Sequence, residues 1–421
     1  MYNSVKKSLN DPQKRSFLRS LGPGLLFAGA AIGVSHLVQS TRAGADFGFG
    51  LLWALILVNL FKYPFFQYGP RYAAATGESL IDGYKKLGNK VLLAYFILTF
   101  LTMFTIQAAV TIVTAGLASN LFGLTENLTI WSMIITLFSF IILSKGKYKI
   151  LDKLMKFIIT ILSISTVIAV ILAYNKTSNT YNLTPVLPKG SVEISFLIAF
   201  LGWMPAPLDI SIWHSLWSIE KNKNNDQKLN TKRFLFDFNV GFITTLLLGI
   251  CFMALGTFVM YHSGEEISSS ANKFAKQLIH MYTSHLGHGA AIFISIAAFT
   301  TMFSTTLTTL DASPRAMAES TKLLLGKKNK YYYLIWITLL ATGTVMILTF
   351  LKTSMITFVK IATILSFLTA PFYAIANFIL ISGKHTPKEF HPSQPLKTLS
   401  YIGILFLIGF SFWYIFSIIW V

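Results

Sequence analysis

The sequence predicts an all-α membrane protein with many transmembrane helices. Of its 421 residues, 54% are hydrophobic and only 12% are charged, whereas a soluble domain carries about 25% charged residues. The apolar residues fall into stretches of about 18 residues or more, the length that an α-helix needs to cross a bilayer. Two of these stretches are interrupted near their middle in corresponding parts of the chain, a pattern typical of transporters with an internal repeat.

Eleven membrane helices are expected, each placed on one apolar stretch between polar or basic segments. Ten of them form two sets of five, residues 22–174 and 192–382. Because five is odd, the second set enters the membrane from the opposite side, so the layout predicts a 5+5 inverted repeat. The helix at 398–420 is an addition to that repeat. The expected spans are 22–45, 48–70, 91–122, 128–144, 151–174, 192–219, 234–262, 288–320, 331–351, 354–382 and 398–420.

Basic residues gather in alternate loops and predict the orientation of the chain. If the N-terminal segment 1–21 is cytoplasmic, the inner segments hold about 26 of the 35 Lys and Arg residues and the outer loops about 5. This positive-inside bias predicts an integral plasma (inner) membrane protein with its N-terminus inside and its C-terminus outside. The net charge of +19 is thereby assigned to topology and to contact with anionic lipid, and we expect no nucleic-acid partner.

The two interruptions are the strongest sign of function. The first is Gly33-Val34-Ser35-His36, and the second is Met204-Pro205-Ala206-Pro207, followed closely by Asp209. Unpaired backbone groups cost several kcal/mol in hydrocarbon, so a broken helix persists there only where it lines a cavity. Either proline would break a helix, while a residue as small as Gly33 lets backbone approach a bound solute. We therefore place the substrate site between the two breaks.

Several short motifs resemble the Nramp metal-ion transporters, most closely in the first helix. The resemblance implies the LeuT-like fold and a secondary transporter that works by alternating access. On the same basis Thr369 of the tenth helix is added to the substrate site. The motifs are Gly22-Pro23-Gly24-Leu25-Leu26, Gly44, Gly48, Leu51-Leu52-Trp53, Gln67, Arg71, Thr76-Gly77, Met204-Pro205, Ser304-Thr305, Thr309 and Pro371-Phe372.

The chain departs from that family's pattern at the residues that bind the metal. Nramp proteins typically carry Asp-Pro-Gly-Asn where this chain has residues 33–36, and Met-Pro-His-Asn where it has 204–207. The carboxylate ligand and the histidine linked to proton movement are therefore missing. The acidic pair of the third helix falls on Gln107 and Val110, and the arginines of the ninth helix have no counterpart. We interpret the chain as a divergent branch, not a typical proton-coupled manganese or iron transporter.

Three classes of substrate remain open. The half-helices that follow Ser35 and Pro207 point their N-termini at the membrane midplane, where free N–H groups and partial positive charge suit an anion. With the acidic ligand missing, a small anion such as bicarbonate is the preferred prediction, and Ser35 and His36 would donate hydrogen bonds to it. The first alternative is a divalent cation held by His36 and Met204. A small organic solute such as an amino acid is the second.

The eighth helix suggests how transport is coupled. Hydroxyls on this helix hold sodium in LeuT-like transporters, so the resemblance implies a Na⁺ site at Ser304 with Thr305 or Thr308. Asp311 shares a helical face with two of these residues. The alternative is that the hydroxyls bond to carbonyl groups of their own helix. Na⁺ is the only cofactor expected, and only as a coupling ion.

Charged residues inside the spans complete the candidates. Such residues cost roughly 2.5–3.5 kcal/mol at the bilayer centre and usually mark function. Asp209 is expected to bind a cation or to pair with Lys62 or Lys360, and the sequence leaves the partner open. An enzyme is not expected, because no nucleophile–base pair or phosphate-binding loop is recognisable. A non-transporting sensor is the remaining alternative, and a monomer is compatible with the sequence.

Overall fold

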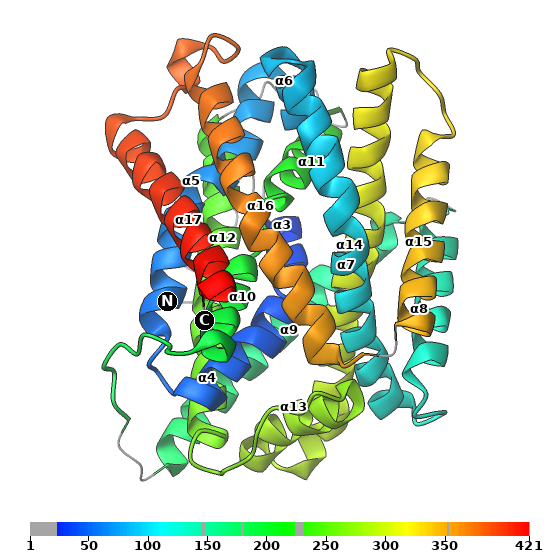
Figure 1. Ribbon diagram of the computed structural model, residues 1–421. Helices are drawn as coiled ribbons and strands as arrows, with labels where there is room; N and C mark the ends of the chain where they lie inside the picture. Colours follow the sequence, from blue (N-terminus) through cyan, green and yellow to red (C-terminus); the bar gives the residue numbers. More distant parts are fainter. Residues whose placement is uncertain (1–22, 145–147, 178–180, 224–230, 352, 421) are drawn as a thin grey trace, which may run out of the picture.

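The computed structural model describes residues 23–144, 148–177, 181–223, 231–351 and 353–420. Within these ranges the chain is helical with no strand, and the long helices run side by side in one bundle (Figure 1). The N-terminal segment that we expect to be cytoplasmic, 1–21, lies outside the described residues. The first half contains α3 (Pro23–Ala31), the π-helix η1 (Ser35–Ser40), α4 (Thr41–Phe47), α5 (Leu52–Thr76), α6 (Leu80–Leu87), α7 (Asn89–Phe122), α8 (Leu128–Ser144) and α9 (Tyr148–Lys176).

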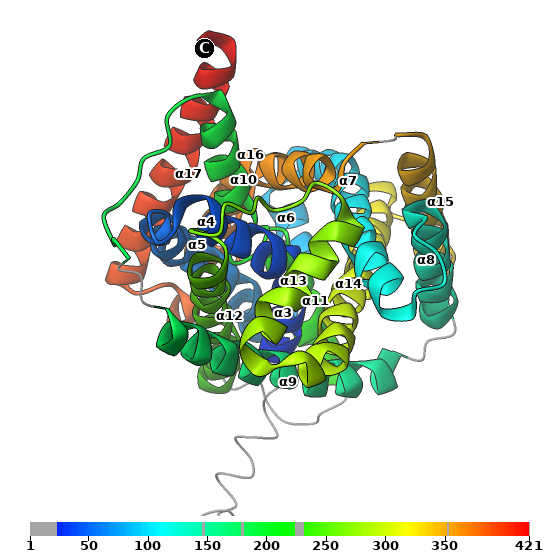
Figure 2. The same ribbon diagram turned by 90° about the horizontal axis from the view of Figure 1, so that it is seen from below.

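The second half repeats the pattern of a broken helix followed by long ones. Figure 2 views the bundle along its axis, with α3, α11 and α14 near the centre and α8 and α15 at one edge. The elements are α10 (Ser191–Trp203), α11 (Ile210–Lys223), α12 (Thr231–Val259), α13 (Ala271–Leu286), η2 (His288–Ala290), α14 (Ala291–Leu325), α15 (Tyr332–Phe350), α16 (Met355–Ser382), η3 (Lys388–Phe390) and α17 (Gln394–Trp420).

Each expected span coincides with one of these helices or with a broken pair. In the part of the chain that the structure describes, α7, α12, α14, α15, α16 and α17 are each long and apolar enough to cross a membrane unaided. The first and sixth spans are divided into shorter helices, and α8 is a shorter apolar helix. Two helices were not expected, α6 and α13. They lie at opposite ends of the bundle, α6 at the top and α13 at the bottom of Figure 1.

The first broken helix packs directly against the backbone of α12. A Cβ atom placed on Gly44 would lie 2.0 Å from the carbonyl oxygen of Met253, and one on Gly256 would lie 2.2 Å from that of Thr41. Near the other end of the contact, a Cβ atom on Gly24 would lie 1.9 Å from the carbonyl oxygen of Asp237. These glycines let the two elements approach more closely than any side chain would allow.

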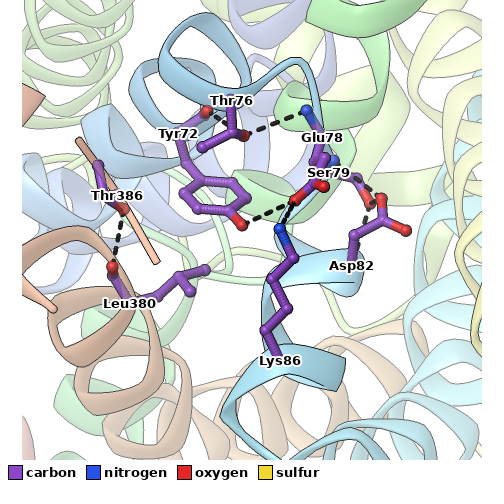
Figure 3. A network of polar contacts seen from close by, with 8 residues as sticks. All are labelled: Tyr72, Thr76, Glu78, Ser79, Asp82, Lys86, Leu380 and Thr386. Atoms are coloured by element: carbon purple, nitrogen blue, oxygen red, sulfur yellow. Dashed lines mark hydrogen bonds and ion pairs between the residues drawn. The ribbon is translucent and has the colours of Figure 1, made fainter. Parts of the chain in front are cut away.

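A polar network closes the end of the bundle near α6 (Figure 3). Ser79 caps α6, because its hydroxyl accepts from the amide of Asp82 while the Asp82 carboxylate accepts from the amide of Ser79. This reciprocal pair satisfies two N–H groups that the helix start would leave free. Glu78 in turn accepts from the hydroxyl of Tyr72 and from the ammonium of Lys86, so α5 and α6 are joined at their turn.

Candidate functional site

The first helix is broken at Ile32 and Gly33, a shorter interruption than the expected 33–36. α3 ends at Ala31, and a π-helix begins at Ser35. The Ala31 carbonyl, left without a helical partner, accepts from the Ser35 hydroxyl at 2.6 Å and lies 3.1 Å from Nδ1 of His36. The Ser35 side chain therefore caps α3, and helical structure resumes directly after it. π-helical turns inside helices often mark functional sites.

His36 faces α12. Its ring is fully buried, and Nε2 lies 2.9 Å from the carbonyl oxygen of Thr245. Because a carbonyl oxygen can only accept, Nε2 carries the proton and has no lone pair for a ligand. Nδ1 contacts the Ser35 hydroxyl at 2.7 Å as well as the Ala31 carbonyl. Both nitrogens thus contact groups of the protein.

The second break covers Met204 to Asp209 and includes the expected residues 204–207. α10 ends at Trp203, α11 begins at Ile210, and the Met204–Pro205 peptide is cis. Pro205 and Pro207 have no backbone N–H groups and cannot donate the hydrogen bonds that would continue α10. Carbonyl groups near the end of α10 therefore lose their helical partners. The break is therefore dictated by the two prolines.

Lys62 of α5 reaches these free carbonyl groups. The side chain is fully buried. Its Nζ donates to the carbonyl oxygens of Leu201 and Gly202, each at 2.7 Å, of Met204 at 3.1 Å and of Ala206 at 3.3 Å. The sequence marked Lys62 as a charged residue in a span, but its partners are backbone groups and carry no side-chain signal.

A small cavity of about 20 Å³ lies between the two breaks. It has room for about one water molecule, and most of its surface is apolar. Gly33 borders the same region, because a Cβ atom there would lie 2.7 Å from the Thr305 hydroxyl. The lining residues are Ala30, Ala31, Val34, Ser35, Ile106, Trp203, Pro207, Ile210, Trp213, Thr305 and Thr309.

The cavity brings together Val34, Ser35 and Pro207 of the expected substrate residues, but its lining does not include the others. Met204 is buried, and its sulfur lies 3.5 Å from the Ser40 hydroxyl. Ala206 is buried and gives its carbonyl to Lys62. Thr369 donates to the carbonyl of Ser366 on its own helix.

Asp209 sits at the start of α11, away from the lining of this cavity. It is 5% exposed, and its Oδ1 has no hydrogen-bond partner within the described chain. Of the two lysines considered as its partner, Lys62 interacts with it electrostatically. No nitrogen of a described basic residue lies within the 4.0 Å of a direct ion pair. Asp209 and Lys62 are therefore not joined by a direct ion pair in this structure.

The expected coupling residues are only partly gathered at the break. Thr305 lies at 3.5 Å from the carbonyl of Ile32 and at 3.3 Å from that of Thr301 on its own helix. Ser304 is buried, and its hydroxyl has no partner among the residues described. Thr308 is also buried. Asp311 is engaged elsewhere, because it pairs with Arg315 at 2.7 Å and accepts from Tyr333 at 2.6 Å.

Gln107 of α7 is a further polar residue beside the cavity. Its amide nitrogen donates to the carbonyl of Thr306, and its oxygen accepts from the hydroxyl of Thr309 at 2.6 Å. These bonds fix α14 against α7 and orient the Thr309 side chain at the cavity wall. No group of three or more His, Cys, Asp or Glu side chains that could hold a metal ion occurs in the described ranges.

Comparison with known proteins identifies relatives over nearly the whole chain. Residues 24–417 match the sequence model of the natural resistance-associated macrophage protein-like (Nramp) family. An uncharacterized protein of Pasteurella multocida is 36% identical over 404 residues, which cover 94% of this chain and 92% of that protein.

Solved transporters share the fold at low sequence identity. A variant of the Eremococcus coleocola manganese transporter has a TM-score of 0.73 and 13% identity, covering 96% of this chain and 87% of that one. Mhp1, a nucleobase–cation symporter with bound bromovinylhydantoin, has a TM-score of 0.62 and 14% identity, with coverages of 95% and 92%. MhsT with bound L-phenylalanine has a TM-score of 0.61 and 13% identity, covering 93% of this chain and 98% of that one. The predicted all-α, LeuT-like fold is confirmed.

Proposed function

The chain belongs to the Nramp family and has the fold of secondary transporters, and from this premise we propose that it carries a small anion such as bicarbonate by alternating access. The substrate would bind between the breaks at Gly33 and Pro207. The observation that carries the proposal is the composition of the cavity wall there, which includes the hydroxyl residues Ser35, Thr305 and Thr309 and no carboxylate.

The backbone beside the cavity adds donors of the kind that an anion needs. Outside the helices, the described backbone hydrogen bonds include none donated by the amides of Gly33 or Val34. Both lie where the second half of the broken helix begins, and free N–H groups at a helix N-terminus favour negative charge. In this structure the cavity is too small for bicarbonate, so binding requires the walls to separate.

A second pocket favours the same sign of charge. It has a volume of about 250 Å³ and lies at the α13 end of the bundle, between η1, α4, α10 and α16. Arg42 and Lys360 line it together with Gln39, and its lining contains no acidic residue. Arg42 is paired with Asp46 at 3.0 Å, so Lys360 is the lining cation for which the described chain shows no ion pair, and its charge raises the local concentration of anions in this pocket.

A divalent cation is the second candidate. It is favoured by the structural likeness to a protein named as a manganese transporter and by the thioether of Met204 at the break. The geometry gives it less support, because the His36 nitrogens are engaged with backbone and hydroxyl groups and the Ala206 carbonyl is bound by Lys62. Coupling to Na⁺ is proposed for either substrate, through the unpartnered Ser304 hydroxyl and Thr305 near the Ile32 carbonyl.

Uptake by the purified protein in liposomes tests the proposal. Radiolabelled bicarbonate and Mn²⁺ are offered separately at pH 8 over a few seconds, with an inward gradient of NaCl or choline chloride. We expect bicarbonate uptake above that of protein-free vesicles, faster with Na⁺, and no Mn²⁺ uptake. Bicarbonate entry no faster than in empty vesicles would refute the anion assignment, and Mn²⁺ entry would favour the second candidate.

Thr305→Val tests whether this wall binds the substrate, with uptake measured in choline chloride so that a loss of Na⁺ coupling does not contribute. It removes the hydroxyl from the cavity wall without changing side-chain shape, so uptake should fall by about tenfold or more, the effect of losing a hydrogen bond to a charged group. Thr300→Val is the matched control on the same helix, because its hydroxyl bonds only to Ile296 at the exposed surface. Equal rates for the two variants would place the substrate elsewhere.

A further inference from the structure

Lys62 occupies a cage of backbone oxygens at the centre of the membrane domain. Four carbonyl groups from the end of α10 and the break that follows surround its Nζ at 2.7–3.3 Å. The cage exists because Pro205, four residues after Leu201, has no N–H to give to that carbonyl. The Gly202 carbonyl is freed in the same way, because Ala206 has left the helix.

The arrangement is that of a charged ammonium group. An ammonium has three N–H donors and no acceptor, whereas a neutral amine has two donors and a lone pair. A neutral amine surrounded by four oxygens would turn its lone pair toward at least one of them, which is repulsive. The carbonyls also form the C-terminal end of α10, where the helix dipole places partial negative charge.

The opposite end of the break carries the opposite charge. Asp209 lies just before α11, at the end where the helix dipole is positive, and interacts electrostatically with Lys62. The break thus holds its own cation at the end of α10 and its own carboxylate at the start of α11. Neither charge requires an ion from solution.

We propose that Lys62 is a specificity-determining residue that fills a latent monovalent-cation site in the broken helix with its own ammonium group. A ring of carbonyl oxygens that replaces a hydration shell is the chemistry by which proteins hold such cations. With the ammonium resident, the carbonyls of the break are closed to metal ions, and the break does not depend on an external cation. This inference deepens the proposed function, but its test needs no transport.

Removing the ammonium should expose the site. Lys62→Met keeps an unbranched apolar side chain and leaves the four carbonyls without a donor. We expect the purified variant to melt at a lower temperature than the parent in choline chloride. NH₄Cl should raise its melting temperature by about 1–3 °C at a few hundred millimolar, because a ligand that binds only the folded state stabilises it. KCl should act similarly, and NaCl less, because the cage is spaced for an ammonium group.

Two further variants make the test decisive. Lys360→Met removes a lysine from the second pocket without touching the break. Like the parent, it should melt at the same temperature in NH₄Cl, KCl and choline chloride, and NaCl should act on both proteins alike, only through the separate Na⁺ site proposed at Ser304 and Thr305. Lys62→Gln keeps two N–H donors but no charge, and should respond to NH₄⁺ as Lys62→Met does. The proposal would be overturned if a folded Lys62 variant melted at the same temperature in NH₄Cl and choline chloride. It would also be overturned if NH₄Cl raised the melting temperature of the parent as much as that of the variant. Because the readout is stability, failure of the anion proposal would leave this result unaffected.

Discussion

The sequence allows two interpretations of His36, a ligand or a hydrogen-bonded core histidine, and the geometry of its contacts distinguishes them. In sequence it stands where the family has a metal ligand, and both a ligand and a bonded core histidine fit the pattern. In the structure both nitrogens contact groups of the protein, one of them across the 209 residues to Thr245. The ring therefore joins the first broken helix to α12.

Replacing His36 by phenylalanine tests that role. The variant removes the bond to the Thr245 carbonyl, which then keeps only its partner within α12, and we expect a loss of about 0.5–1.5 kcal/mol of stability, the net contribution of a typical hydrogen bond. The loss should appear as a lower melting temperature. His280→Phe, at an exposed position, should melt like the parent. An unchanged melting temperature with abolished uptake would instead make His36 a ligand of the substrate.

From the sequence, Lys62 could be recognised only as a charged residue inside an expected membrane span. The cost of burying it in lipid predicts a partner, and the partner proved to be four carbonyl groups freed by prolines 140 or so residues later. Backbone groups look alike at every position in a sequence. The pairing was therefore beyond prediction, although each half of it, the lysine and the broken helix, was visible.

At the scale of elements, apolar length and proline placed the long helices and the second break. The first break is shorter than expected, and the Ser35 side chain returns to the Ala31 carbonyl there, a bond that a span pattern does not show. α6 and α13 were missed because both lie in polar segments between spans. They pack on opposite ends of the bundle. A Cβ atom on Gly83 of α6, for example, would lie 2.2 Å from the Leu380 side chain.

The contact between α4 and α12 should be intolerant of even one added methyl group. In Gly256→Ala the new Cβ would lie 2.2 Å from the backbone carbonyl of Thr41, so one backbone must move. Overpacking of this kind costs about 1–3 kcal/mol, and the melting temperature should fall. Gly409→Ala on α17 is the matched control, since no atom lies within 4 Å of its added methyl group. Equal melting temperatures would show that the two elements are not held at this distance.

At the scale of the molecule, the bilayer explains why so much of the fold could be predicted. Hydrocarbon demands long apolar helices, so the spans and their number could be read from one sequence. The substrate could not be predicted, because the cavity between the breaks has a mostly apolar lining with a few hydroxyl groups, such as those of Ser35 and Thr305, which suits several small solutes. The division into repeats at 22–174 and 192–382 stays a prediction.

The orientation of the whole molecule is open to a direct experiment. In a Cys251→Ser background, Glu265→Cys near α13 should react with a membrane-impermeant maleimide added to intact cells. Lys384→Cys, beyond the end of α16, should react only after the cells are opened. Both positions are exposed in the structure, so the difference reports sidedness, not burial. The reverse pattern of labelling would show that the distribution of basic residues had misled the assignment of the cytoplasmic face.

The buried lysine is synthesised well before the backbone groups that it binds. Lys62 is synthesised 139 residues before the first of its carbonyl partners, a delay of roughly 7–28 s at about 5–20 residues per second. During that interval the nascent second span contains the Lys62 ammonium group, while the four carbonyl groups that bind it have not yet been synthesised. The long side chain has to reach toward the lipid headgroups, and this span can settle to its final depth only when α10 arrives.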